Sequence, residues 1–164
     1  MKSNFTTNRL LLSLLTVDRD EFILELVNTP DWLRFIGDRN IRSADDARAY
    51  IGKIAQNPMF TYWVVELLNE QTPIGIITYI KRDYLEFHDI GFAFLPEYAK
   101  SGYAFEATSV ILDYLSVERI TEQLLASTVP DNARSIRLLT KLGFVQERTM
   151  EVNETKLLIY RLSL

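Results

Sequence analysis

Hydrophobic residues recur along this chain with two spacings, one typical of strands and one typical of helices. Three runs rich in β-branched and aromatic residues, 61–68, 73–81 and 86–94, follow one another with turn signals between them. Such residues favour strands, and short turns between successive strands favour hairpins. The pattern therefore predicts an antiparallel meander in the middle of the chain.

Helical spacing appears clearly in three segments. Ser43 and Asp46 form a start similar to a capping box, and Asn57 and Pro58 end the segment that follows. A second helix is predicted from Gly102. A third runs from Asn132 to Gly143, a glycine placed as at a helix C′ position. The residues at helical spacing in the first helix are Ala47, Tyr50, Ile51, Ile54 and Ala55. Those expected to be buried are Ala104, Ala107, Ile111 and Leu115 in the second helix and Ile136, Leu139 and Leu142 in the third.

The other elements complete a single domain. A first strand over 9–16 and a short helix over 18–27 precede the meander, and a strand over 123–129 separates the last two helices. Segments 144–152 and 156–162 read as a final hairpin. We predict an α+β (mixed αβ) fold over residues 1–164, with a central mixed sheet of six or seven strands and helices on both faces.

Charge and composition exclude some classes of function. The net charge of −4 and a pI near 5.1 argue against a nucleic-acid surface, which needs basic patches. An acidic balance suits a cationic acceptor such as an amine, although an ordinary surface gives the same balance. The absence of cysteine excludes disulfides, thiolate metal sites and a cysteine nucleophile, and we expect no metal site.

The apolar run near the N-terminus does not have the pattern of a secretory signal. Ser13 and Thr16 interrupt residues 10–17, charged residues follow, and no cleavage motif of small residues is present. No run reaches the length of about 18 apolar residues that predicts a membrane span. We expect a cytoplasmic protein without membrane or nucleic-acid partners, either a monomer or a homodimer.

The segment 96–107, PEYAKSGYAFEA, has the features of an anion-binding turn. Gly102 and Ala104 carry little side-chain bulk where a strand end turns into a helix, so backbone N–H groups can approach a phosphate and the helix dipole favours the anion. The strand over 123–129 follows that helix. A strand–helix–strand order makes a crossover that carries this helix start and the next one, at Asn132, to one edge of the sheet.

These two segments resemble the GNAT superfamily of acetyl-CoA-dependent N-acetyltransferases, in particular its ribosomal-protein-acetyltransferase-like branch. The family signature Q/R-x-x-G-x-G/A falls on Ala99, Lys100, Ser101, Gly102, Tyr103 and Ala104, with Ala99 in place of the usual Gln or Arg. The segment 132–144 is similar to the branch pattern N-x-x-S-x-x-L-x-x-K-L-G-F. The likeness extends from about Thr7 to the C-terminus.

The resemblance implies a GNAT-like acyl-CoA N-acyltransferase fold and acetyl-CoA as co-substrate. It implies that the phosphates bind backbone groups of residues 99–104, with Lys100 as a possible added charge. It also implies that the pantetheine arm lies between two strands that splay apart. The groups expected to hold that arm are the main chain of Phe92, Ala93 and Phe94 and the side chains of Asn132 and Ser135.

Each of these residues also has a purely structural interpretation. Gly102 and Ala104 would equally permit close packing between a helix and a strand. Asn132 is a residue that commonly caps helices, and Lys100 is typical of a solvated turn. Alternating aromatic residues such as Phe92 and Phe94 are usually core.

The general base is less clearly indicated. Asp89 is the first candidate because the branch often carries a carboxylate at this position, and His88 is the alternative because its ordinary pKa near 6.5 suits proton transfer. The two are adjacent on a strand and so point to opposite faces. Glu66 and Glu86 are further candidates, both expected to face solvent. Leu139 stands where many relatives have a tyrosine acid.

Two classes of function remain open from the sequence. The first is an N-acetyltransferase acting on a primary amine, either a protein N-terminal α-amine or a small-molecule amine, by direct attack on the thioester. The second is a non-catalytic acyl-CoA-binding module. In the first case the family layout places the segment 32–43 in the acceptor wall, although Trp32 and Phe35 could equally be core.

Overall fold

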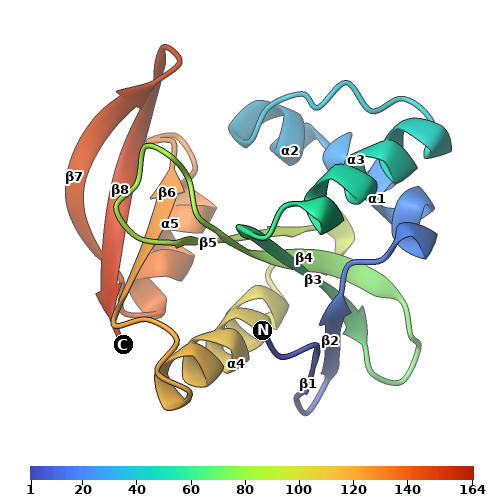
Figure 1. Ribbon diagram of the computed structural model, residues 1–164, viewed down its shortest axis with the longest axis horizontal. Helices are drawn as coiled ribbons and strands as arrows, with labels where there is room; N and C mark the ends of the chain where they lie inside the picture. Colours follow the sequence, from blue (N-terminus) through green and yellow to red (C-terminus); the bar gives the residue numbers. More distant parts are fainter.

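The computed structural model describes residues 1–164, and its centre is one eight-stranded sheet (Figure 1). The strand order is β1-β2-β3-β4-β5-β6-β8-β7. The strands are β1 (Asn4–Thr6), β2 (Leu10–Leu14), β3 (Phe60–Leu67), β4 (Pro73–Ile80), β5 (Asp89–Phe94), β6 (Gln123–Thr128), β7 (Val145–Val152) and β8 (Thr155–Ser163). The predicted meander β3-β4-β5 and the final hairpin β7-β8 are confirmed. The extra strand is β1, whose three residues are too few to give a pattern.

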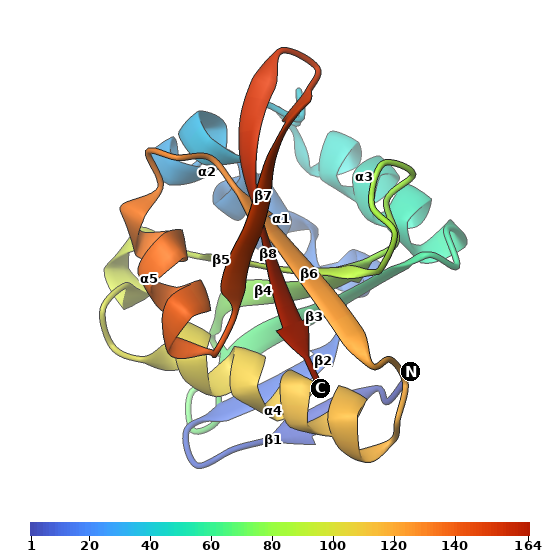
Figure 2. The same cartoon turned by 90° about the vertical axis from the view of Figure 1, so that its left-hand side faces the viewer.

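The helices cover both faces of the sheet. One face carries α1 (Asp20–Val27), α2 (Pro30–Phe35) and α3 (Ala44–Gln56), and the other carries α4 (Tyr103–Val117) and α5 (Ala133–Lys141), as Figures 1 and 2 show. Two hydrophobic clusters follow this division. The larger packs α4 and α5 against the sheet around Trp63, Ile77 and Ile111, and the second packs α1–α3 around Val64 and Ile76.

Two details differ from the prediction. Helix α2 was not predicted, because six residues are too few for a clear period; its Trp32 is buried in the second cluster. Strand β5 begins at Asp89 rather than at residue 86. The preceding residues instead fold over β6 and β8, where Leu85 forms a third cluster with Leu125 and Ile159. This contact depends on residues distant in sequence, so strand propensity could not indicate it.

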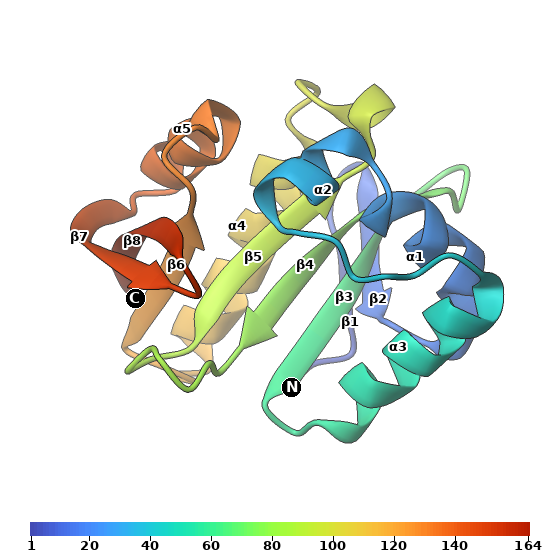
Figure 3. The same ribbon diagram turned by 90° about the horizontal axis from the view of Figure 1, so that it is seen from above.

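The sheet opens between its two parallel strands. Strands β5 and β6 share a single bridge, between Asp89 and Leu125, and the Leu125 N–H donates to the His88 carbonyl (2.9 Å). Beyond that point they diverge, and Figure 3 shows β5 with α1–α3 on one side of the divergence and β6–β8 with α5 on the other. We call the space between the diverging strands the wedge. No helix has the length and apolar character needed to cross a membrane.

Candidate active site

The β5 side of the wedge presents unpaired main-chain groups. The Leu95 N–H donates to the Ile74 carbonyl on β4 (2.9 Å), and the direction of hydrogen bonding alternates along a strand. Ala93 therefore pairs with Ile76 on β4, whereas Phe92 and Phe94 direct their N–H and C=O groups toward β6. Since β6 has diverged there, these groups are left free to bind a ligand that enters the wedge.

The turn before α4 has the geometry of an anion-binding site. Lys100 (φ 65°) and Gly102 (φ 82°) both adopt left-handed backbone conformations, and α4 begins directly afterwards at Tyr103. The six consecutive backbone N–H groups from Lys100 to Phe105 donate no hydrogen bond within the protein. A run of free N–H groups at the start of a fifteen-residue helix attracts an anion through both the donors and the helix dipole.

Arg9 supports this turn from a distant part of the chain. Its Nη1 donates to the Ser101 carbonyl (3.0 Å), and its Nε and Nη2 contact Glu106 on the first turns of α4 (2.7 and 2.6 Å). The guanidinium also lies over the ring of Tyr103, 4.4 Å from its centre. Sequence reasoning missed Arg9 because it lies more than ninety positions before the turn.

Glu106 is held ionised inside this arrangement. Partial burial acts to raise its pKa, but the hydrogen bonds from Thr7 and Arg9 outweigh burial and leave the pKa below its ordinary value. A carboxylate so close to the N–H groups of Lys100 to Phe105 would repel a phosphate. The Arg9 guanidinium compensates that charge, so Arg9 both fixes the turn and keeps it receptive to an anion.

Asn132 caps α5 at the other wall of the wedge. Its Oδ1 accepts a hydrogen bond from the Ser135 N–H (3.1 Å), which is the capping interaction. The Asn132 Nδ2 and the Ser135 hydroxyl make no hydrogen bond within the protein, and both residues are half-buried. Capping therefore leaves two polar groups able to contact a ligand.

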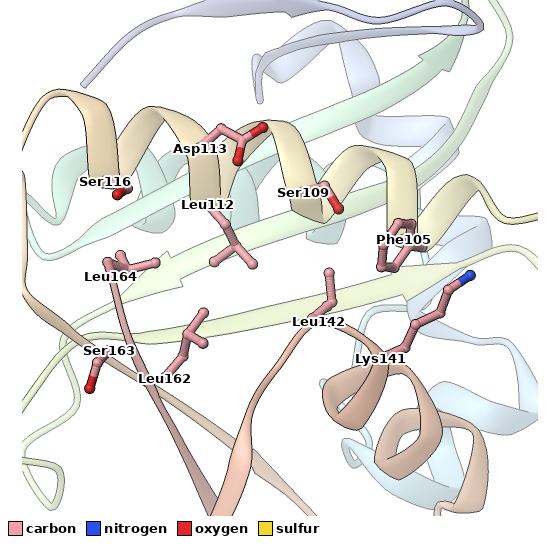
Figure 4. Close-up of a pocket in the computed structure, with 10 residues that line it drawn as sticks. All are labelled: Phe105, Ser109, Leu112, Asp113, Ser116, Lys141, Leu142, Leu162, Ser163 and Leu164. Carbon is pink, nitrogen blue, oxygen red and sulfur yellow. The ribbon is translucent and has the colours of Figure 1, made fainter.

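A groove leads away from the turn along α4. Its first part, about 530 Å³, is lined by Arg9, Gly102 and Glu106 among others, and it shares Phe105 and Lys141 with a second part of about 350 Å³. Figure 4 shows the second part between α4, the end of α5 and the last residues of β8. The Lys141 ammonium lies 4.2 Å from the centre of the Phe105 ring. The groove thus combines an apolar floor with a cation beside the turn.

The two base candidates lie on opposite faces of the sheet. His88 stacks flat on Tyr79 at 4.3 Å, and burial together with the nearby Lys81 lowers its pKa, so the ring is neutral at pH 7. Asp89 is 3% exposed, and both of its oxygens accept from the Nε of Arg82 at 3.0 Å. Burial raises the pKa of Asp89 against the opposing effect of Arg82. Asp89 shares the α1–α3 face with Ala93.

Of the other two carboxylates, both expected to face solvent, Glu66 is buried and Glu86 is exposed. Glu66 is 3% exposed and pairs with Arg19 at 2.6 Å, because the 3-10 turn before α1 brings Arg19 over β3. Glu86 is exposed, and its contacts with Arg148 and Arg161 hold its pKa at about 2. Neither carboxylate is free in this structure.

Comparison with known proteins identifies similar chains. Residues 9–145 match the profile of a family described as an acetyltransferase (GNAT) domain. The chain is 28% identical over 144 residues to the uncharacterized N-acetyltransferase YnaD of Bacillus subtilis strain 168. The matched region covers 88% of this chain and 84% of YnaD.

Solved structures share the fold. A GNAT-family acetyltransferase from Bacillus anthracis has a TM-score of 0.82 at 23% identity, and the match covers 98% of each chain. Ribosomal-protein-S5-alanine acetyltransferase from Vibrio fischeri also has a TM-score of 0.82, at 18% identity over 99% of this chain and 97% of its own.

Proposed function

Because this chain belongs to the GNAT acetyltransferase family and is an acetyltransferase, we propose that it transfers the acetyl group of acetyl-CoA to a primary amine. The acceptor is a protein N-terminal α-amine or a small-molecule amine. The observation that carries the proposal is the run of free N–H groups from Lys100 to Phe105 beside the wedge. Family membership favours turnover over the alternative of a non-catalytic acyl-CoA-binding module.

Residues 99–104 hold the pyrophosphate of the coenzyme. Main-chain N–H groups from Lys100 to Ala104 supply the contacts, since the Ala99 N–H already donates to the Pro96 carbonyl (3.1 Å), and the Lys100 side chain adds a charge. Ala99 offers no side-chain donor where the signature has Gln or Arg, and Arg9, directly before β2, supplies a cation at the same turn. The groove along α4 accommodates the nucleotide end of the coenzyme.

The wedge holds the pantetheine arm and the thioester. Phe92 and Phe94 bind through their free main-chain groups, Ala93 forms the floor on the α1–α3 face, and Asn132 and Ser135 contact the arm from the α5 side. This arrangement fixes the thioester carbonyl where an N–H of β5 can stabilise the developing oxyanion.

The reaction is a direct attack. The amine nitrogen forms a bond to the thioester carbon, the carbon–sulfur bond breaks, the nitrogen loses a proton and the thiolate gains one. We assign the proton removal to Asp89, acting through water, with its burial-raised pKa as support; His88 on the opposite face is the alternative. Leu139 is buried at the position of the usual tyrosine acid, so the proton for the thiolate comes from water or from Tyr103.

An amine that is already partly neutral suits such a site. A model α-amine has a pKa near 8 and a lysine near 10.4, so at pH 7 about a tenth of the first but under about a thousandth of the second lacks its proton. We therefore favour an α-amine or another amine of low pKa. The segment 32–43, which runs from within α2 to the N-cap of α3, forms part of the acceptor wall.

Release of free thiol from acetyl-CoA tests the proposal. The acceptors are a peptide with a free N-terminus, the same peptide N-blocked but carrying one lysine, and small amines, all at matched pH. The expected result is amine-dependent thiol release, fastest with the free N-terminus. Thiol release confined to the blocked lysine peptide would contradict the acceptor assignment, and no release with any amine would contradict the transfer itself.

A further inference from the structure

Three carboxylates are buried in this protein, and each is paired with an arginine. Asp20 forms an ion pair with the terminal Nη2 atom of Arg48 (2.7 Å), and Glu66 forms one with the terminal Nη2 atom of Arg19 (2.6 Å). Asp89 is paired differently, because among the nitrogens of Arg82 only Nε donates a hydrogen bond to it. The two terminal nitrogens of Arg82, Nη1 and Nη2, therefore make no contact with the Asp89 carboxylate.

The two terminal amino groups of Arg82 make no hydrogen bond within the protein, as Nε alone is a donor to a protein group. The side chain is 34% exposed, so these groups reach the surface of the α1–α3 face. A guanidinium presents its donors in a rigid planar fork, and anchoring through Nε fixes the orientation of the fork. Such an arrangement is a preformed receptor for an oxyanion.

The charges around this fork favour an anion over a cation. Burial alone would lower the pKa of Arg82, but Asp89 and Tyr84 raise it, so the guanidinium is charged at all relevant pH values. The nearby Tyr62 is neutral because burial raises its pKa far above its ordinary value. Glu86, four positions along the chain, is already paired with Arg148 and Arg161.

The fork also lies close to the proposed transfer site. Asp89, its anchor, bridges Leu125 at the closed end of the wedge, three positions before Phe92. At a strand rise of about 3.3 Å per residue this is about 10 Å along β5. An extended peptide covers the same distance in about three residues.

We propose that Arg82 binds an oxyanion of the acceptor, so that the substrate is an acidic peptide whose N-terminal amine is acetylated and whose second to fourth residues include a carboxylate. This inference rests on the proposed acetyl transfer. It adds a specificity-determining residue. A phosphate at the same positions offers the same chemistry as the carboxylate.

Matched peptides test the preference. Pairs that differ only by Glu or Gln at position 2, 3 or 4 are compared by kcat/KM for thiol release, with a phosphoserine peptide and an amino-terminated aliphatic carboxylate as further acceptors. A charge-assisted pair predicts at least about a tenfold preference for the Glu peptide at its best position. A phosphoserine preference without a Glu preference would assign the site to phosphate and overturn the carboxylate claim. Equal rates for all members of each pair would overturn the proposal.

Variants assign the preference to Arg82. R82K keeps a positive charge beside Asp89 but lacks the fork, and it should lose most of the Glu/Gln ratio, whatever its effect on the rate with the Gln peptides. R48Q is the matched control, since it also removes a guanidinium from a buried aspartate but lies on α3, and it should keep the ratio. A ratio retained in folded R82K, or lost equally in R48Q, would overturn the proposal.

A binding measurement separates this proposal from the proposed function. Fluorescently labelled Glu and Gln peptides are titrated with wild-type protein and with R82K. Tighter binding of the Glu peptide by the wild type alone supports the acidic-acceptor site even if no thiol is released, an outcome that would reject acetyl transfer only. Equal binding together with amine-dependent thiol release would reject the Arg82 proposal and leave acetyl transfer standing.

Discussion

Replacing Arg9 by alanine should weaken coenzyme binding more than it weakens the fold. The substitution removes an ion pair with Glu106, a hydrogen bond to the Ser101 carbonyl and a contact with the Tyr103 ring. For a side chain that is 45% exposed, we take about 0.5 kcal/mol for the ion pair, about 0.5 for the ring contact and about 1 for the hydrogen bond. The sum is about 2 kcal/mol, shared between stability and the ordering of the turn.

The substitution should also weaken coenzyme binding through a second, electrostatic effect. Without Arg9, the Glu106 carboxylate is uncompensated beside the N–H groups that are proposed to hold the pyrophosphate. We therefore expect R9A to raise the KM for acetyl-CoA by about tenfold, which corresponds to about 1.4 kcal/mol, while kcat changes little.

Acetyl-pantetheine provides the decisive comparison because it lacks the nucleotide pyrophosphate. Initial rates with acetyl-CoA and acetyl-pantetheine are measured for the wild type, for R9A and for R9K. The selectivity for acetyl-CoA should fall in R9A and recover partly in R9K, whereas the acetyl-pantetheine rate should stay near that of the wild type. Equal losses with both donors would refute the reasoning, since they would assign Arg9 a role in stability alone.

Three further variants examine the wedge, the base and the hairpin. N132A should lose about 1 kcal/mol of stability as a cap and also bind coenzyme A more weakly, and an unchanged affinity with a lower melting temperature would leave only the cap. D89N should lower kcat by about 10²-fold or more with little change in coenzyme affinity, with H88Q as its control; near-full activity of D89N from pH 6 to 9 would remove Asp89 as base. Because the pKa of Glu86 is lowered from 4.5 to about 2, its ion pairs with Arg148 contribute stability that is present above about pH 4.5 and lost as the pH falls toward 2. E86Q should therefore melt lower than the wild type at pH 7 but lose less on going to pH 3, and parallel losses would show that Glu86 is not the group responsible.

Local patterns were sufficient where neighbouring residues determine the structure. The Ser43 cap, the helix start after Gly102 and the Asn132 cap all depend on contacts within a few positions, and each lies where the sequence indicated. The strand–helix–strand order indicated the crossover that makes β5 and β6 parallel, whereas the wedge between them was expected only from the family resemblance.

Contacts between distant segments were not predictable in the same way. Arg9 reaches Ser101, and Arg19 covers Glu66, because the sheet places these segments side by side. A charged residue in an alternating strand normally indicates the solvent face. Glu66 is buried because its ion pair with Arg19 offsets the free-energy cost of removing the carboxylate from water. The free fork of Arg82 depends on which nitrogen contacts Asp89, which no sequence pattern records.

Calorimetric titration of coenzyme A into the wild type and G102V tests the central claim most directly. Valine cannot easily adopt the left-handed conformation of Gly102, and its Cβ would lie 3.4 Å from the Arg9 Nη2, so the phosphate turn is disturbed while the core is untouched. The account predicts that the wild type binds coenzyme A and that folded G102V binds it at least about tenfold more weakly. Absence of binding by the wild type, or equal affinity in a folded G102V, would contradict the assignment of this turn as the coenzyme site.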